Sequence, residues 1–184
     1  DLVVSSFLLL VTSPLFILVS ILIFIEDRGP LFYSQQRTGL NGEKFNIIKF
    51  RSMKIDAEKN GVQWSKHTDP RVTHIGRIIR ATRIDELPQL ICVIKGEMSF
   101  VGPRPERQFY AEQLIAKAPH YKHLYKVKPG ITSWGMVKFG YAENLEEMLE
   151  RLKYDILYIE NMSLLIDLKI MIHTILIILQ GRGK

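Results

Sequence analysis

The sequence predicts a mixed α/β (α+β) protein that is rich in helices and associates with a membrane. Residues 2–25 carry no charged side chain and form one long apolar segment. Two short runs with strand character, residues 31–36 and 45–50, flank a turn that contains glycine. Much of the remaining chain has helical spacing, interrupted by loops with glycine or proline. We therefore expect a small, largely antiparallel sheet or hairpin among short helices, with membrane-associated helices at both ends.

Composition favours one domain with an anionic partner. The 184 residues suffice for one domain with its own core plus a membrane element. The mean hydropathy of +0.05 is high for a chain with 24% charged residues, because both ends are apolar while the middle is charged. The net charge of +6 suits nucleic acid, an acidic lipid surface or a phosphorylated substrate. The single cysteine, Cys92, excludes an internal disulfide and lies in an apolar run, as a small buried side chain does.

The N-terminal segment, residues 1–26, is long enough to cross a hydrocarbon core of ~30 Å as a helix. Ser13-Pro14 near its middle should kink or break this helix, and the Thr12 and Ser13 hydroxyls could satisfy the freed carbonyls. The helix either spans the bilayer with a kink or turns back at Ser13-Pro14, and proline tolerance in membrane helices favours spanning. Because the apolar run begins at the first residues, we also expect that an upstream membrane domain is missing from this chain.

The second segment, residues 27–184, begins with a basic hairpin. Thr38 to Gly42 reads as the turn between the two strands, because both of its glycines accept positive φ. This assignment puts Arg37 at the turn, and it puts Lys49 and Arg51 on one strand face by their spacing of two. The basic side chains either face solvent or belong to an anion-binding pocket.

An acidic pair, Asp85-Glu86, follows a predicted helix over residues 72–82 and should open the next helix. The positive end of a helix favours an ionised Asp85. Because neighbouring carboxylates repel each other, a pair beside Arg80 and Arg83 is a candidate for metal or phosphate chemistry. The competing interpretation is a solvated helix start.

Residues 96–105 read as a loop or short strand, in which Pro103 and Pro105 restrict Arg104 and preorganise its guanidinium for phosphate. We expect residues 56–69 to form a polar loop and residues 128–132 to form a turn. The segments expected to be helical are 106–117 and 144–158. Between them, Trp134, Met136 and Phe139 serve either packing or a membrane-facing lip.

Residues 163–179 are strongly apolar, but Asp167, Lys169 and His173 interrupt them. Two charges make a spanning helix costly. We expect an amphipathic helix lying in the membrane interface, with Arg182 and Lys184 reaching toward anionic headgroups. The alternative is a buried core helix.

The chain resembles the bacterial sugar transferase family, the monotopic polyprenol-phosphate phosphoglycosyl transferases, over nearly its whole length. The resemblance rests on many motifs in order: Ser13-Pro14, Gln36-Arg37-Thr38-Gly39, Lys49-Phe50-Arg51-Ser52-Met53, Asp69-Pro70-Arg71, Asp85-Glu86-Leu87-Pro88-Gln89-Leu90, Gly102-Pro103-Arg104-Pro105, Lys128-Pro129-Gly130-Ile131-Thr132 and Asp167-Leu168-Lys169. Thr38 stands where many members have proline, and Ser133 where glycine is common.

The resemblance implies an enzyme that moves a sugar-1-phosphate from a UDP-sugar to undecaprenyl phosphate, releasing UMP, as an early membrane step in surface polysaccharide synthesis. It implies that Asp85 is the nucleophile and forms a covalent phospho-sugar intermediate, and that Glu86, with Asp85, binds Mg²⁺. Arg104 and Arg80 should hold phosphate. Further candidates for the same pocket are Lys49, Arg51 and Arg37.

The resemblance also implies a re-entrant helix that is broken at Ser13-Pro14 and does not cross the bilayer, which reverses the preference for spanning. The catalytic domain would then lie on the cytoplasmic face of the bacterial inner membrane. We expect no nucleic-acid partner, and a homodimer is left open. The rival interpretations are a non-catalytic module that binds anionic lipid or nucleic acid, and a scaffold subunit in which Asp85-Glu86 only caps a helix.

Overall fold

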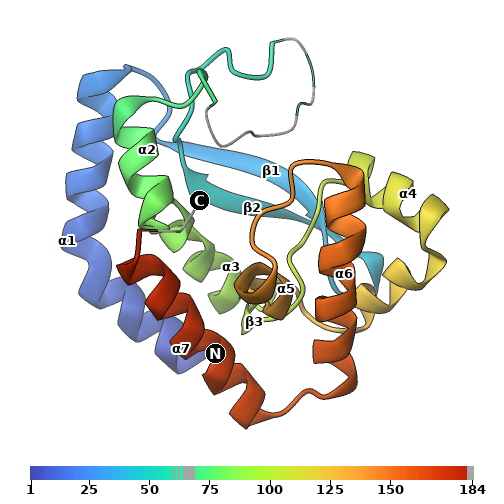
Figure 1. Ribbon diagram of the computed structural model, residues 1–184. Helices are drawn as coiled ribbons and strands as arrows, with labels where there is room; N and C mark the ends of the chain where they lie inside the picture. Colours follow the sequence, from blue (N-terminus) through green and yellow to red (C-terminus); the bar gives the residue numbers. More distant parts are fainter. Residues whose placement is uncertain (60, 62, 64–68, 182–184) are drawn as a thin grey trace.

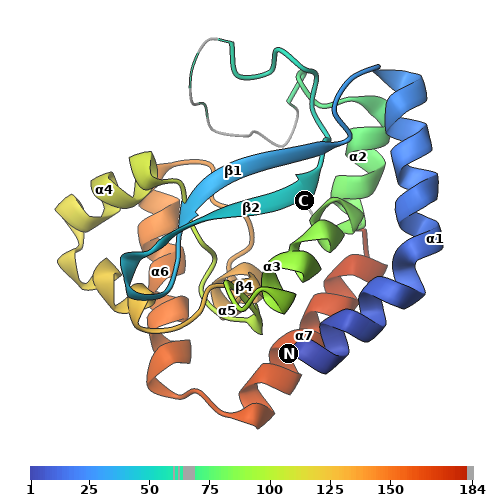
Figure 2. The ribbon, with the colours of Figure 1, turned by 180° about the vertical axis from the view of Figure 1, so that it is seen from behind.

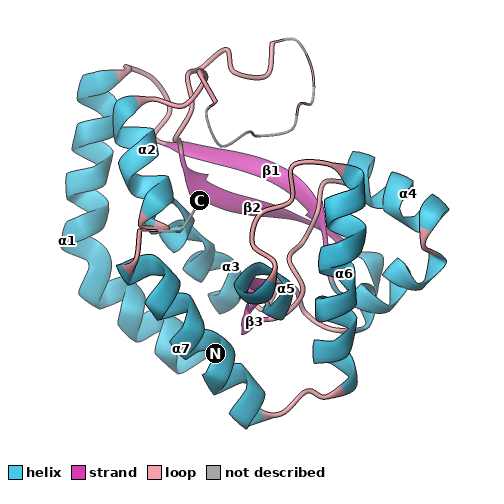
Figure 3. Ribbon diagram, in the orientation of Figure 1, coloured by secondary structure: helices cyan, strands magenta, loops and turns pink. Residues whose placement is uncertain are grey.

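The computed structural model describes residues 1–59, 61, 63 and 69–181. Helices predominate, and the strands form two small sheets among them (Figures 1 and 3). The helix-rich α+β prediction is confirmed. Part of the predicted polar loop 56–69 lies outside the described residues, as do Arg182 and Lys184.

The first sheet is the predicted antiparallel hairpin of β1 (Phe32–Thr38) and β2 (Lys44–Phe50). A short 3-10 helix, η1 (Leu40–Gly42), forms its turn, with positive φ at Asn41 and Gly42. Arg37 lies in β1 opposite Phe45, so its predicted place at the turn is wrong. The strand extends through Thr38, which still pairs with Lys44, and the turn begins after it.

One face of β2 covers a core cluster. Phe45 and Ile47 are buried against Cys92, Val93 and Met98, and Cys92 is the buried small side chain that the sequence predicts. Cys92 and Val93 lie in α3 (Leu90–Ile94), the last of three consecutive helices. The two before it are α2 (His74–Ala81) and the 3-10 helix η2 (Ile84–Gln89). The Asp85-Glu86 pair lies in the first turn of η2, so its predicted place at the start of the next helix is confirmed, although this helix is a 3-10 helix and packs against β2.

The second sheet pairs β3 (Ser99–Val101) with β4 (Gly130–Thr132) in parallel. Residues 128–132 were expected to form a turn, and this expectation is wrong because residues 130–132 form β4. The expectation of a largely antiparallel sheet holds for the longer hairpin, and this short parallel pair is an addition to it. The pairing depends on close backbone approach. A Cβ on Gly102 would meet the Lys128 carbonyl oxygen at 2.3 Å, and a Cβ on Gly130 would meet the Gly102 nitrogen at 2.1 Å.

The right side of Figure 1 is a helical cluster formed by α4 (Gln108–Lys117), the 3-10 helix η3 (Pro119–Lys126) and α6 (Leu145–Glu160). Tyr110, Leu114, Tyr121 and Leu152 form its buried core. The short α5 (Trp134–Lys138) packs against α6, and a Cβ on Gly135 would meet Arg151 and Asp155. The predicted helices over 106–117 and 144–158 are confirmed.

Helix α1 (Leu2–Glu26) is continuous in secondary structure through Pro14, and Figure 1 shows it bending partway along. The Ser13 hydroxyl donates to the Leu10 carbonyl at 2.8 Å, and the Thr12 hydroxyl donates to Leu8 at 2.7 Å. Leu10 is the residue whose carbonyl loses its helical donor when position 14 is proline. The expected compensation at Ser13-Pro14 is confirmed, while the path of the helix relative to a bilayer stays a prediction.

Among the described residues, α1 is the one helix long and apolar enough to cross a membrane, and 11% of its most apolar window is buried. Its C-terminal half contacts the rest of the protein: Val19 and Ile23 pack with Phe50 and Ile79. Seen from behind, α1 lies along α2 and α3 (Figure 2).

Helix α7 (Leu164–Leu179) has only one buried residue, Ile170. Its exposed apolar residues are Leu164, Leu165, Leu168, Ile172, Ile175, Leu176 and Leu179. The alternative of a buried core helix is therefore wrong. The location of α7 in a membrane interface stays a prediction.

Candidate active site

A cavity of about 360 Å³ lies beside the hairpin and the acidic pair. Its described lining includes all seven candidate residues from the sequence: Arg37, Lys49, Arg51, Arg80, Asp85, Glu86 and Arg104. Lysine and arginine outnumber the acids in this described lining, where the acids are Glu58, Asp85, Glu86 and Glu106. The fold thus gathers residues that are far apart in sequence into one electropositive pocket.

The hairpin supplies one wall. Side chains two residues apart in β1 face the cavity, namely Tyr33, Gln35 and Arg37, and Lys49 comes from the opposite strand β2. Period-two spacing explains this arrangement, because alternate residues of a strand point to the same face. Arg51 lines the cavity just beyond the end of β2, as its spacing from Lys49 predicts.

Glu86 is held by three cations. Its Oε1 accepts from Lys49 Nζ at 2.6 Å and from Arg104 Nη2 at 3.1 Å, while Oε2 lies 3.5 Å from Arg83 Nη1. Burial alone would raise the pKa of Glu86, but Lys49, Arg104 and Arg83 outweigh burial and hold this pKa well below its usual range. Glu86 is therefore a fixed negative charge.

Asp85 has the opposite environment. Within the described part of the chain, no hydrogen bond or ion pair joins its carboxylate to another side chain, although the residue is buried. Burial raises its pKa to about 6, and Glu86 adds to this rise, while Lys49, Arg80 and Arg104 oppose it. The expected helix-end effect on Asp85 is thus wrong in direction, because desolvation dominates. The carboxylate is still mostly ionised at pH 7.

Arg104 is positioned by the second sheet. Gly102 N donates to Thr132 O at 3.0 Å, and Gly130 N donates to Pro103 O at 3.0 Å, so the two residues that precede Arg104 are fixed to β4. Burial would lower the pKa of Arg104, but Glu86 more than compensates and raises it. A permanently charged guanidinium is thereby held at the acidic pair.

Tyr141 lines this end of the cavity, and Arg83 lies behind it in contact with Glu86 and the Tyr141 ring. Arg83 has φ 56°, a left-handed conformation that costs a non-glycine residue energy and that turns the chain from α2 into η2. The Tyr141 ring lies beside two guanidinium groups, with centroid distances of 5.4 Å to Arg83 Cζ and 5.7 Å to Arg104 Cζ. Burial and the charge of Glu86 raise the pKa of Tyr141.

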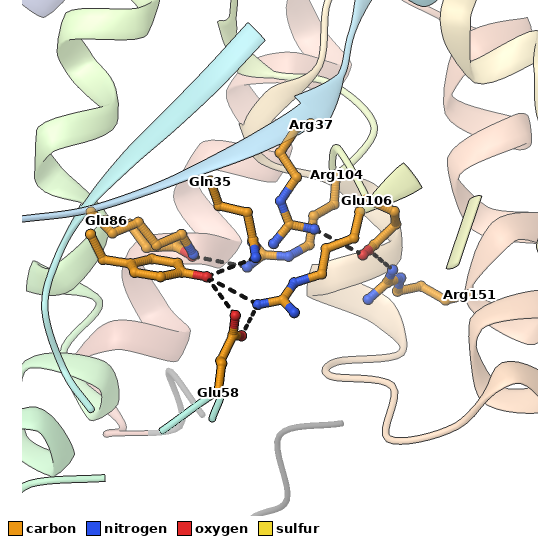
Figure 4. Close-up of polar contacts among 10 residues, drawn as sticks. Gln35, Arg37, Glu58, Glu86, Arg104, Glu106 and Arg151 are labelled. Carbon is orange, nitrogen blue, oxygen red and sulfur yellow. Dashed lines mark hydrogen bonds and ion pairs between the residues drawn. The ribbon is translucent and has the colours of Figure 1, made fainter. Parts of the chain in front are cut away.

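The other end of the cavity contains a second network (Figure 4). Glu106 lies 3.6 Å from Arg37 Nη1 and accepts from Arg151 Nη2 at 2.5 Å. Tyr33 Oη accepts from Gln35 Nε2 at 2.7 Å and from Arg107 Nη2 at 3.1 Å, and Arg107 also pairs with Glu58. Several buried guanidinium nitrogens that line the cavity have no hydrogen-bond partner: Arg37 Nε, Arg51 Nη1 and Arg107 Nη1. Such unpaired cationic donors suit an anion.

The model of the family described as bacterial sugar transferase matches residues 1–181 of this chain. The chain belongs to the bacterial sugar transferase family. The resemblance seen in the sequence is thereby confirmed, and the cavity described above lies inside the matched region.

Curated relatives agree with this assignment. The UDP-N-acetylgalactosamine-undecaprenyl-phosphate N-acetylgalactosaminephosphotransferase of Aeromonas hydrophila is 42% identical over 93% of this chain and 40% of its own length. The UDP-glucose:undecaprenyl-phosphate glucose-1-phosphate transferase of Caulobacter vibrioides is 40% identical over 95% of this chain and 66% of its own length. The UDP-glucose:undecaprenyl-phosphate glucose-1-phosphate transferase of Escherichia coli K12 is 37% identical over 95% of this chain and 38% of its own length. The chain therefore spans less than two thirds of these relatives.

The sequence alone assigned no role to several residues that line this transferase cavity. Arg83, which the sequence placed beside the acidic pair, contacts Glu86, because residues three apart meet on a helical turn. Tyr33, Gln35, Arg107, Glu106, Arg151 and Tyr141 are brought together only by tertiary packing. Arg51, by contrast, contacts the Asp27 carbonyl and lies 3.7 Å from the Asp27 carboxylate, so it also ties the hairpin to the end of α1.

Proposed function

We propose that this chain is the catalytic part of a phosphoglycosyl transferase that moves a sugar-1-phosphate from a UDP-sugar to undecaprenyl phosphate. The observation that carries the proposal is the asymmetry of the acidic pair. Glu86 contacts three cations, while its neighbour Asp85 is buried, mostly ionised and without an ion pair to any described residue. A carboxylate that is free of partners yet surrounded by phosphate-binding cations is suited to attack phosphorus.

The reaction proceeds in two displacements. An Asp85 oxygen attacks the phosphorus that bears the sugar, a new O–P bond forms, and the bond to the bridging oxygen breaks so that UMP leaves with the electron pair. A phosphate oxygen of undecaprenyl phosphate then attacks the same phosphorus, and the bond to Asp85 breaks. The products are undecaprenyl-diphosphate-sugar, UMP and a regenerated carboxylate.

The cations of the cavity bind and orient the diphosphate. Arg104 is fixed beside the pair by β4 and Glu86, and Lys49 and Arg80 also lower the pKa of Asp85. Fixed donors stabilise charge as it develops on the phosphoryl oxygens, because they need no reorganisation during the reaction. The unpaired Arg37 and Arg107 nitrogens at the other end supply further anion contacts.

The pair fits Mg²⁺ that is shared with a substrate. Among the described residues, no group of three or more His, Cys, Asp and Glu side chains could hold a metal, so the described side chains alone offer the ion too few ligands. Magnesium commonly takes one or two carboxylates and completes its shell with substrate phosphates. Glu86 Oε2, whose one described partner is Arg83 at 3.5 Å, and the Asp85 carboxylate are the available oxygens. When bound, Mg²⁺ would offset charge on the diphosphate.

The apolar helix α1 supplies the membrane attachment that such a reaction needs. One substrate is soluble and the other is confined to the bilayer, so the cavity must open at the headgroup level. UDP-sugars are made in the cytoplasm, and we therefore assign the catalytic domain to the cytoplasmic face of the bacterial inner membrane. A re-entrant α1, which contains Pro14 and bends partway along, would keep both of its ends on that face.

Nucleotide release tests this proposal. The wild-type protein in detergent or lipid is incubated with UDP-glucose, UDP-galactose, and their N-acetylated forms, with Mg²⁺ and with or without undecaprenyl phosphate. We expect UMP release that follows one or a few donors, and about one UMP per protein when the acceptor is absent. A folded protein that binds donor but releases no UMP would instead be a binding module. Release by Asp85→Asn at the wild-type rate would remove Asp85 as the nucleophile.

A further inference from the structure

Helix α7 carries a lysine within its exposed apolar stripe. Lys169 follows Leu165 by four residues and precedes Ile172 by three, so the three side chains lie on one face of the helix. All three are exposed. The opposite face attaches α7 to the protein, where Ile170 is fully buried and the hydroxyls of Thr132 and Thr174 lie 2.7 Å apart. The stripe and its lysine therefore point away from the core in a fixed orientation.

Three basic groups converge on Trp134 at the junction of α5 and α7. Lys138 Nζ lies 4.8 Å from the ring centroid and Lys169 Nζ lies 5.6 Å from it. The His173 ring stacks on the same indole, with centroids 6.4 Å apart and an interplanar angle of 22°. Trp134 itself packs against the buried cluster of Val101, Tyr158 and Ile170, so the group is anchored.

No acid neutralises this group in the part of the chain that the structure describes. Neither Lys138 nor Lys169 forms an ion pair there, and His173 Nδ1 is buried without a hydrogen-bond partner. The nearby acids have other partners: Asp167 accepts from the Tyr158 hydroxyl at 2.8 Å, and Asp155 accepts from Gly135 N at 2.9 Å. An unmatched basic group at the edge of an apolar stripe is an amphipathic binding surface.

We propose that Trp134, Lys138, Lys169 and His173 bind the phosphate headgroup of an anionic bilayer lipid, with the apolar stripe of α7 in contact with its acyl chains. Tryptophan favours the membrane–water boundary, and lysines extend their ammonium groups from apolar surfaces to the headgroups. This site is separate from the catalytic cavity, whose lining includes none of the four residues. The inference rests on the membrane location proposed above and not on the transferase reaction.

A second copy of the chain fits this face less well. A twofold interface pairs the same patch of both copies, so the basic group of one copy would face the basic group of the other. Like charges in a desolvated interface are unfavourable. An anionic headgroup matches the same surface without this repulsion.

Tryptophan fluorescence provides the test. The sequence contains two tryptophans, so a Trp64→Phe background leaves Trp134 as the single emitter. The protein in non-ionic detergent micelles is titrated with dihexanoyl phosphatidylglycerol, and in parallel with dihexanoyl phosphatidylcholine and with inorganic phosphate. We expect a saturable emission change with phosphatidylglycerol alone. Lys138→Gln and Lys169→Gln should each weaken it about five-fold. The matched controls, Lys122→Gln and Lys126→Gln, remove exposed lysines from η3 and should leave it unchanged.

Several results would overturn the proposal. An equal response to phosphatidylcholine would mean that charge is not recognised, and saturation by inorganic phosphate would assign a free-phosphate site. Equal losses in the η3 controls would mean non-specific attraction. An emission change that follows protein concentration and not lipid would assign the face to a second copy. UMP release is measured on the same samples, so failure of the transferase proposal is seen separately.

Discussion

Lys49 Nζ lies 2.6 Å from Glu86 Oε1, and this contact joins strand β2 of the hairpin to the 3-10 helix that carries the acidic pair. Both side chains are largely buried, with exposed fractions of 17% and 3%. The buried ion pair fixes where the acidic pair lies relative to the hairpin wall of the cavity. Its removal should therefore affect both folding and catalysis.

Glu86→Gln should lower the free energy of unfolding by roughly 3 kcal/mol, because three buried cations would then face a neutral amide. The measurement is thermal unfolding in detergent. The matched control is Glu150→Gln, which removes an acid from the exposed Lys153–Glu150 pair and should change stability little. If both variants melt at the same temperature, the ion pairs of Glu86 do not stabilise the fold.

The pH dependence of activity should follow Asp85. Its pKa is raised to about 6, and only the carboxylate form attacks, so kcat/KM should fall about ten-fold per pH unit below 6 and level off above 7. Since folding raises this pKa above its ordinary value, the folded state binds the proton more tightly. Asp85 therefore adds stability as the pH falls from about 6 toward 4, while activity is lost.

Asp155 provides the control for this pH profile, because burial raises its pKa to about 6 as well. Asp155 lies outside the catalytic pair and accepts a hydrogen bond from Gly135 N. In Asp155→Asn, the acid limb of the kcat/KM profile should stay in place. Its disappearance in that variant would assign the limb to Asp155.

Tyr141 should act through its ring. Tyr141→Leu removes the aromatic surface beside Arg83 and Arg104, and a cation–π contribution of about 1 kcal/mol predicts a roughly five-fold rise in KM for the UDP-sugar. Tyr141→Phe keeps the ring and should retain most of the donor affinity. Steady-state kinetics of UMP release measures both. Equal losses in the two variants would point to the hydroxyl group instead of the ring.

Topology can be tested at residue 2. In a Cys92→Ala background, Leu2→Cys should react with a membrane-impermeant maleimide only after the cells are permeabilised, because a re-entrant α1 keeps both ends in the cytoplasm. The exposed Lys153→Cys in the catalytic domain is the internal reference and should behave identically. Labelling of Leu2→Cys in intact cells, with Lys153→Cys protected, would show that α1 spans the bilayer.

Short sequence patterns predicted the elements whose formation depends on residues close together in the chain. The hairpin follows from period-two spacing around a glycine turn, and the Ser13 compensation follows from the missing donor of Pro14. The parallel pairing of β3 with β4 had no local signal, because α4 and η3 separate the two strands in the sequence. The only hint was a pair of glycines, Gly102 and Gly130, whose backbones touch.

The candidate site was predictable in its residues but not in its electrostatics. All seven candidates line one cavity, and the family motifs account for that success. The pKa of Asp85 depends on burial against β2 and on the cations around it, which the sequence alone does not reveal. The same holds for Glu106, whose partners Arg37 and Arg151 come from distant elements.

The most direct test of the account is the mass of the protein itself. Wild-type protein is mixed with the UDP-sugar that supports UMP release, without acceptor, quenched rapidly and examined by intact and peptide mass spectrometry. The account predicts an added sugar-phosphate on the peptide that contains Asp85, lost when undecaprenyl phosphate is added and absent from Asp85→Asn. UMP release that requires the acceptor, with no adduct at any time, would contradict the covalent route and with it the role of Asp85.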